Sequence, residues 1–167
     1  SGSSNFYLAQ TNPCRIASLP GVTLYADNMS ENNGVETQVL HPGSRLLFRH
    51  WEALRGALPC PSRAHFKLDA VRTIVPQLFI LEPDPRSLSH RYRLAGTGLT
   101  EFYGYDATGR DFLENWDPFE RQVQLKVLKT AIRELQPALI RSRHLTDTGE
   151  DIGVEVIALP FSLPKRG

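Results

Sequence analysis

The segment spanning residues 90–116 (HRYRLAGTGLTEFYGYDATGRDFLENW) limits the possible folds of this chain more than any other feature of its sequence. Arginine alternates with an apolar residue at positions 91–94, and this period of two is typical of a strand with one polar and one apolar face. The alternation ends at Gly96, after which aromatic residues crowd between further glycines where the chain can turn tightly. A strand that leads into glycine-rich, aromatic turns predicts the wall of a pocket.

Size and composition favour one soluble domain. The chain has 167 residues, 41% of them hydrophobic, which is enough for one domain with a core. A formal net charge of +1 with scattered basic residues predicts no nucleic-acid partner. No apolar run approaches the ~20 residues that a spanning helix needs, so we expect no membrane segment and a cytoplasmic protein. Cys14 and Cys60 stand far apart in the sequence, which predicts neither a disulfide framework nor a metal site.

The first 40 residues are predicted to be an N-terminal extension, and residues 41–167 the domain. Residues 1–4 (SGSS) resemble a cloning remnant, and Pro13 and Pro20 argue against a helix in the segment that follows. Met29 is the chain's only methionine and a candidate natural start, which would make residues 5–28 an upstream addition.

The remaining elements follow from periodicity and capping residues. Ser44 is predicted to cap a helix that ends near Gly56 and carries Leu47, Trp51 and Leu54 on one face. Residues 77–81 and 91–95 predict an antiparallel hairpin. Asp117, Pro118 and Glu120 match the N-cap, N1 and N3 positions of a long helix, whose apolar residues recur at fourfold spacing from Phe119 to Leu135. Strands at 138–146 and 152–161 follow, separated by a turn.

Together these residues resemble the PAS domain, and more narrowly the bacterial single-domain PAS-like family common in alphaproteobacteria. The matching stretches are HPGSRLLFRHWEALRG, LPCPSR with IVPQLFILE, RLAGTGLTEFYGYDATGRD and IGVEVIALPFS, within residues 41–164. The resemblance implies an α+β fold, in which an antiparallel sheet has small helices and one long helix packed on one face, plus an N-terminal helix. It also implies that a ligand would lie between the sheet and these helices.

A PAS sheet usually has five strands, and the residues from 41 onward supply four clear ones. The domain therefore lacks its last strand by truncation, takes a strand from residues 5–28, or receives one from a partner chain. An unpaired sheet edge would otherwise invite aggregation or strand exchange.

The residues that bind haem or a covalent flavin in PAS domains have no counterpart in this sequence. No histidine stands between His90 and His144, where the resemblance places the iron ligand of a haem sensor. Cys60 lies in a proline-bounded loop, outside the segment that carries the reactive cysteine of flavin-binding members. We therefore expect neither haem nor a covalently bound flavin.

The candidate ligand-binding residues are Arg93, Thr97, Tyr103, Phe112, Trp116 and Phe119. Thr97 and Tyr103 would supply hydrogen bonds within an otherwise apolar cavity, as in most small-molecule sites. The alternative is that the aromatic residues simply fill the core. Arg93 has two interpretations as well, a cross-sheet ion pair with Glu155 or an anchor for an acidic ligand.

We expect no catalytic residues. The sequence has no G-x-S-x-G, H-E-x-x-H or phosphate-binding G-x-x-x-x-G-K motif. Cys60, with Arg63 and His65 nearby, forms the only cluster in which a thiol pKa would fall. A small thiol-dependent enzyme is therefore the second alternative function.

The first hypothesis is a sensory or regulatory module that binds a small molecule and signals through protein–protein contacts. Because no effector domain follows in this sequence, the signal would pass through a dimer or a signalling-protein partner. By the resemblance, Leu47, Trp51 and Leu54 would form a homodimer interface, and packing on the domain's own sheet is the alternative. A ligand-free dimerisation or adaptor module is the first alternative function.

Overall fold

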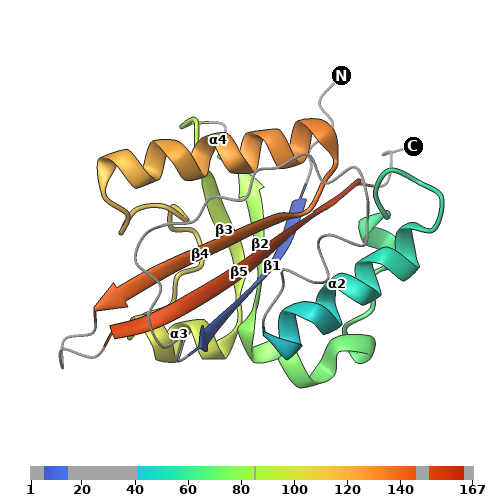
Figure 1. Ribbon diagram of the computed structural model, residues 1–167, viewed down its shortest axis with the longest axis horizontal. Coiled ribbons are helices and arrows are strands. Elements are labelled where there is room, and N and C mark those ends of the chain that lie inside the picture. The colour runs from blue at the N-terminus through green and yellow to red at the C-terminus, as the bar shows by residue number, and fades with distance from the viewer. Residues whose placement is uncertain (1–5, 15–40, 85, 146–150, 164–167) are drawn as a thin grey trace.

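The computed structural model describes residues 6–14, 41–84, 86–145 and 151–163 (Figure 1). The expectations for residues 1–4 and for a start at Met29 lie outside the described residues.

A five-stranded antiparallel sheet, in the order β3-β2-β1-β5-β4, forms the middle of the molecule. The strands are β1 (Phe6–Cys14), β2 (Leu78–Pro83), β3 (His90–Ala95), β4 (Ala138–Leu145) and β5 (Asp151–Phe161). The predicted pairing of β2 with β3 is confirmed, and β4 pairs with β5. β1 lies between these two pairs and is antiparallel to both β2 and β5. The fifth strand therefore comes from within residues 5–28, one of the three sources that the sequence left open.

The helices have the following bounds, and side chains cap the first turns of α2 and α4. They are α2 (Pro42–Arg55), α3 (Thr97–Tyr103) and α4 (Pro118–Glu134), with the 3-10 helices η1 (Arg63–His65) and η2 (Leu68–Gln77). Asp117 caps α4 as predicted, because its carboxylate accepts hydrogen bonds from the next two free N–H groups. The predicted cap of α2 at Ser44 is wrong. The His41 imidazole takes that role by accepting a hydrogen bond from the Gly43 N–H at 3.0 Å.

Helices cover both faces of the sheet, and a separate apolar cluster fills each gap. On one face α3 and α4 pack on side chains such as Phe79, Val154 and Val156. On the other face α2 and η2 pack on Ile157 and Leu159. Successive residues of β5 thus point to opposite clusters, as the pleat of a strand requires. The predicted α+β class is confirmed, with α3 and the long helix α4 packed on one face of an antiparallel sheet and an N-terminal helix, α2, in addition. The small helix η2 differs from the prediction, because it packs on the other face with α2.

Gly96 ends β3 because another part of the backbone passes too close for a side chain. Its N–H donates a hydrogen bond to the Leu78 carbonyl at 2.8 Å. A Cβ at this position would lie 2.3 Å from the Pro76 carbonyl oxygen, well inside van der Waals contact. This approach explains why the strand pattern stops at Gly96 and α3 begins directly after it.

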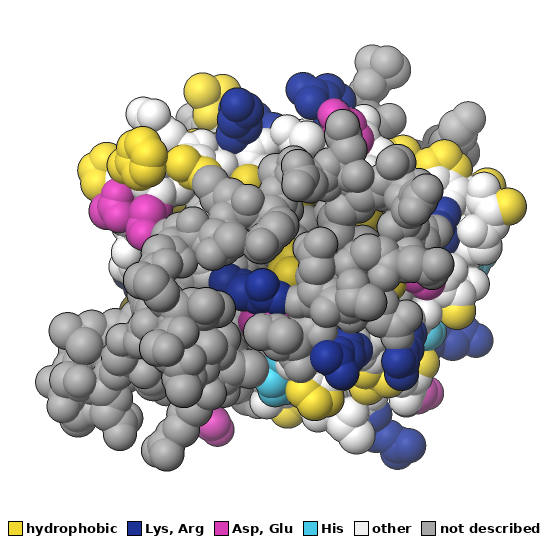
Figure 2. All heavy atoms as spheres, in the orientation of Figure 1, with side chains coloured by type: hydrophobic (Ala, Val, Ile, Leu, Met, Phe, Trp, Pro, Cys, Tyr) yellow, Lys and Arg dark blue, Asp and Glu magenta, His cyan; other side chains and the backbone are white. Residues whose placement is uncertain are grey.

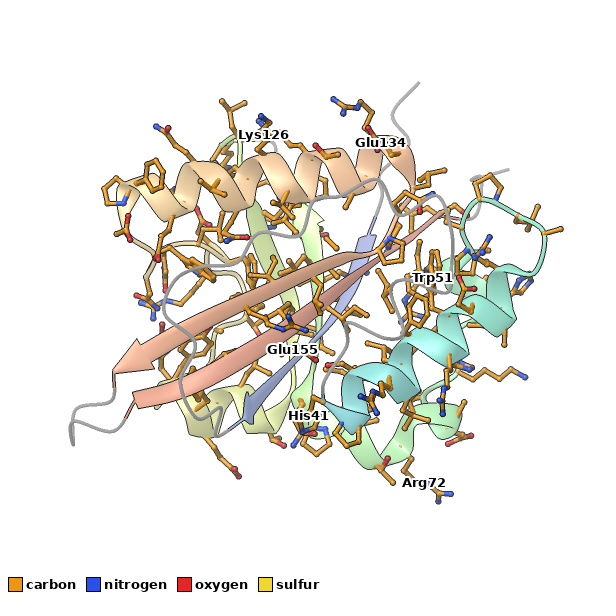
Figure 3. All side chains as sticks on the ribbon, viewed as in Figure 1. His41, Trp51, Arg72, Lys126, Glu134 and Glu155 are labelled. Carbon is orange, nitrogen blue, oxygen red and sulfur yellow. The ribbon has the colours of Figure 1, made fainter. Side chains whose placement is uncertain are left out.

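The apolar stripe of α2 is buried against the chain's own sheet. Leu47 and Trp51 are almost fully buried, and Leu54 is partly buried against the same cluster. The Trp51 indole donates a hydrogen bond to the Pro160 carbonyl on β5 at 2.8 Å, and Figure 3 shows its side chain between α2 and the strands. In this conformation the three residues predicted for a dimer interface face the interior of their own domain.

Two adjacent leucines of α2 test this arrangement. Leu47 is fully buried, whereas Leu46 keeps 37% of its surface exposed. We expect Leu47→Ala to lower the free energy of unfolding by about 2–5 kcal/mol, because it leaves a cavity. Leu46→Ala, the matched control, should cost less than about 1 kcal/mol. Urea unfolding and the mass in solution are the measurements, and a Leu47→Ala protein of unchanged stability with a lower oligomer mass would contradict the arrangement.

Candidate functional site

The interior between α4 and the sheet is built mainly from aromatic rings. Phe79 on β2, Tyr92 on β3 and Phe112 in the segment before α4 are all buried. Their ring centroids lie 5.3 to 5.6 Å apart, and the Tyr92 ring meets both phenylalanines edge-on. Because edge-to-face contacts at such distances are favourable, the three rings hold one another in fixed orientations.

A pair of tyrosine hydroxyls supplies polar atoms to this aromatic interior. The hydroxyl oxygens of Tyr92 and Tyr103 lie 3.3 Å apart. Burial raises the pKa of Tyr92 and also that of Tyr103. Both phenols are therefore neutral at neutral pH, and each carries one O–H donor and an acceptor oxygen.

An ion pair fastens the beginning of α4 to the segment before it and to β3. The Arg121 guanidinium contacts the Asp111 carboxylate and donates a hydrogen bond to the Leu113 carbonyl at 3.1 Å. Asp111 also accepts hydrogen bonds from the Ser89 hydroxyl at 2.7 Å and from the Leu113 N–H at 2.8 Å. Burial alone would raise the pKa of Asp111, but these hydrogen bonds and the Arg121 charge hold it below its usual value. We call the contacts of Asp111 with Ser89, Leu113 and Arg121 the Asp111 latch.

Two further polar side chains are buried, His90 at the start of β3 and Gln124 on α4. Burial lowers the pKa of His90 to about 4, with Asp111 raising it and Lys129 lowering it further. The imidazole is therefore neutral at pH 7. Gln124 is fully buried on α4, and neither amide atom has a hydrogen-bond partner in the part of the chain that the structure describes.

The structure brings some of the predicted ligand-binding residues into this interior and leaves others outside it. Tyr103, Phe112 and Trp116 pack in the cluster between α4 and the sheet. Arg93, Thr97 and Phe119 are exposed, and Phe119 keeps 75% of its surface in water. The exposed residues are therefore not part of the buried site.

The predicted ion pair between Arg93 and Glu155 is wrong, because β2 and β1 separate their strands. Arg93 instead lies 3.8 Å from the Glu82 carboxylate. Glu155 is fully buried and accepts hydrogen bonds from Arg141 on β4 at 3.2 Å and from the His41 N–H at 3.1 Å. Figure 3 shows His41 at the beginning of α2 and Glu155 on the sheet. This carboxylate therefore ties α2 to the sheet and plays no part in the aromatic interior.

Cys60, the one candidate nucleophile, is buried beside Ser162. Burial raises the pKa of its thiol, and the hydrogen bonds from Ser162 offset this only in part. A raised pKa reduces the thiolate fraction at neutral pH, whereas catalytic cysteines need the thiolate. The thiol-enzyme alternative therefore has no activated nucleophile at Cys60.

The described residues were also compared with what a metal ion, a membrane or a nucleic acid would require. Among them, no group of three or more His, Cys, Asp or Glu side chains is placed to hold a metal ion. Within the same residues, no helix has the length and apolar character needed to span a membrane. On the face drawn in Figure 2, the described Lys and Arg side chains stand in several separate places. A nucleic-acid surface would gather them in one stripe or patch.

The sequence did not single out Gln124 or His90. The buried face of α4 carries Gln124, Leu128 and Ala131, whereas the apolar pattern predicted a stripe that begins at Phe119. A glutamine is normally assigned to the polar side of a helix. Its position in the helix could have identified it. Gln124 stands four residues before Leu128 and seven before Ala131, and residues at these spacings lie on the same face of a helix.

A protein-family model described as a PAS domain matches residues 39–166 of the chain. The match covers more than half of the sequence and includes each helix that the structure describes and each described strand except β1. No curated protein and no solved structure matches the chain significantly. The central strand of the sheet thus lies outside the residues that the family model matches.

The Asp111 latch makes a prediction for acid stability. Because the pKa of Asp111 is lower in the folded chain than in the unfolded chain, the latch stabilises the fold above about pH 4, the usual Asp pKa, and this stabilisation is lost as the pH falls further. We expect Asp111→Asn to lower the free energy of unfolding at pH 7. We also expect this free energy to decrease less between pH 5 and pH 3 than it does in the unaltered chain. Urea unfolding across this range is the measurement, with Glu101→Gln, at an exposed position of α3, as the control. An Asp111→Asn protein with the acid profile of the unaltered chain would exclude the latch.

Proposed function

The chain belongs to the PAS domain family, and from this premise we propose that it senses a small molecule held between α4 and the sheet. A PAS domain is in general a sensory or regulatory module. The proposed output is a change in the contacts that the domain makes with a signalling protein or a second copy of itself.

The observation that carries the proposal is the composition of the interior beneath α4. The Tyr92 ring on β3 packs against Phe79 on β2 and Phe112 in the segment before α4. Its hydroxyl lies 3.3 Å from the hydroxyl of Tyr103. Small-molecule sites are commonly built in this way, from mostly apolar walls with a few fixed polar groups that orient the ligand.

The Asp111 latch offers a route for the signal out of this interior. It joins the first turns of α4 to the residues on either side of the aromatic cluster, Ser89 before β3 and Leu113 after Phe112. A ligand that binds one arrangement of α4 better than another shifts the population toward that arrangement. The outer face of α4, where Figure 3 shows Lys126 and Glu134 pointing away from the sheet, would present the change to a partner.

The proposed role is non-catalytic and cytoplasmic. The buried, protonated thiol of Cys60 supports the first part, since this side chain was the candidate nucleophile. The absence of a long apolar run from the sequence supports the second. A ligand-free adaptor is the competing function, and in that case the same aromatic rings would serve only as core.

Native mass spectrometry of the purified full chain, followed by a melting screen with small molecules, tests the ligand. We expect an excess mass that disappears when the same sample is denatured in acid. We also expect at least one compound to raise the melting temperature, because a ligand at 100 times its Kd stabilises the fold by about 2.7 kcal/mol. A bare polypeptide mass together with a screen without any stabilising compound would favour the adaptor.

A further inference from the structure

The amide of Gln124 points to the chemical class of the bound molecule. Gln124 is fully buried and stands on α4 between Arg121, which reaches the Asp111 latch, and Leu128, which lies in the core cluster. Lys126, two residues further on, projects from the opposite side of the helix, away from the sheet (Figure 3). Because residues two apart on a helix lie about 200° apart, the Gln124 side chain is directed toward the sheet.

The buried amide needs a hydrogen-bond partner that the described residues do not give it. A primary amide carries one acceptor oxygen and two N–H donors. Neither the oxygen nor the nitrogen of Gln124 has a hydrogen-bond partner among the described residues. Leaving such a group unpaired costs about 1–3 kcal/mol, and buried polar groups in native proteins are almost always paired. The amide therefore calls for a molecule that offers an acceptor and a donor side by side.

The charges around this interior argue for a neutral molecule. The tyrosine hydroxyls and the His90 imidazole are uncharged at neutral pH, because burial raises the pKa of the phenols and lowers the pKa of His90 to about 4. Asp111 and Arg121 neutralise each other within the latch, and Lys129 is exposed. An anion placed here would lose its hydration without gaining an opposite charge, which is costly.

Building on the function proposed above, we propose that the ligand is a neutral aromatic compound whose amide-like edge pairs with Gln124. Its ring would lie among the aromatic side chains beneath α4, and its donor and acceptor would complete the hydrogen bonds of the Gln124 amide. Carboxylates and phosphates of the same size would be rejected.

Benzamide and benzoate test this inference, because they share a ring and differ in having a neutral amide or a charged carboxylate. Binding of each to the full chain is followed by NMR at pH 7. We expect the Kd of benzamide to be at least about tenfold lower than that of benzoate. We also expect benzamide to shift the Gln124 side-chain NH2 signal, which is assigned in the unaltered chain through its connection to the Gln124 backbone signals. Benzamide should leave the corresponding signal of Gln122, an exposed residue on α4, unchanged.

Two variants separate the amide from the surrounding interior. Gln124→Met has a similar volume but no hydrogen-bonding group, and we expect it to reduce the preference for benzamide to about twofold or less. Gln122→Met, the matched control, should keep the full preference. Melting curves show whether each variant folds. If Gln124→Met does not fold, the NMR shift in the unaltered chain decides the question.

The outcomes distinguish this inference from the proposed function. Equal or tighter binding of benzoate, an unmoved Gln124 signal, or a preference that survives Gln124→Met overturns the neutral-ligand inference. A Gln124 amide paired with an internal water would give the unmoved signal. Failure of both probes to bind also overturns it, whereas a small molecule retained in the native mass spectrum would leave the sensory function standing.

Discussion

The backbone ladders on the two edges of β1 are the interaction on which the rest of the structure depends. β2 with β3, and β4 with β5, are two antiparallel pairs, and among the described strands only β1 pairs with a member of each. Residues Phe6 to Cys14 pair along β5, and Tyr7 to Gln10 also pair along β2. Without β1, the inner edges of β2 and β5 would be two unpaired edges, which promote aggregation.

Both helical layers rely on this continuous sheet. α2 is attached to β5 through the Trp51 indole and through the buried Glu155 carboxylate, which accepts the His41 N–H. α4 is attached on the other face through Arg121, whose partner Asp111 is bound to Ser89 beside β3. The apolar cluster beneath α4 takes side chains from β2, β3 and β5, so it is continuous only when β1 joins the two pairs of strands.

Features set by local sequence could be predicted, whereas features set by the arrangement of strands could not. The cap at Asp117 is encoded within a few residues and is found in the structure. The glycine at position 96 correctly marked the end of β3, although the cause of the break is the approach of the Pro76 backbone. The ion pair expected for Arg93 and Glu155 failed because it depended on which strands are neighbours. Strand order is a global property, and here it places two strands between these residues.

The candidate site shows the same division. Tyr103, Phe112 and Trp116 were predicted to bind a ligand from the glycine-rich, aromatic segment that carries them, and in the structure they pack in one cluster. Phe119 was also predicted but lies outside, because the face of α4 that packs on the sheet is centred on Gln124 and Leu128. A polar residue at the centre of a buried helix face runs against hydrophobic patterning. Such a departure is expected at functional positions.

Hydrogen exchange at the backbone of β1 is the most direct test of the central claim, that the N-terminal strand completes the sheet of this PAS domain. The N–H groups of Leu8, Ala9 and Gln10 lie between β2 and β5. They should therefore exchange only through global unfolding, as slowly as Leu81 and Val156 in the neighbouring strands. Exchange of the β1 amides at the rate of an unstructured peptide, while Leu81 and Val156 stay protected, would contradict this account.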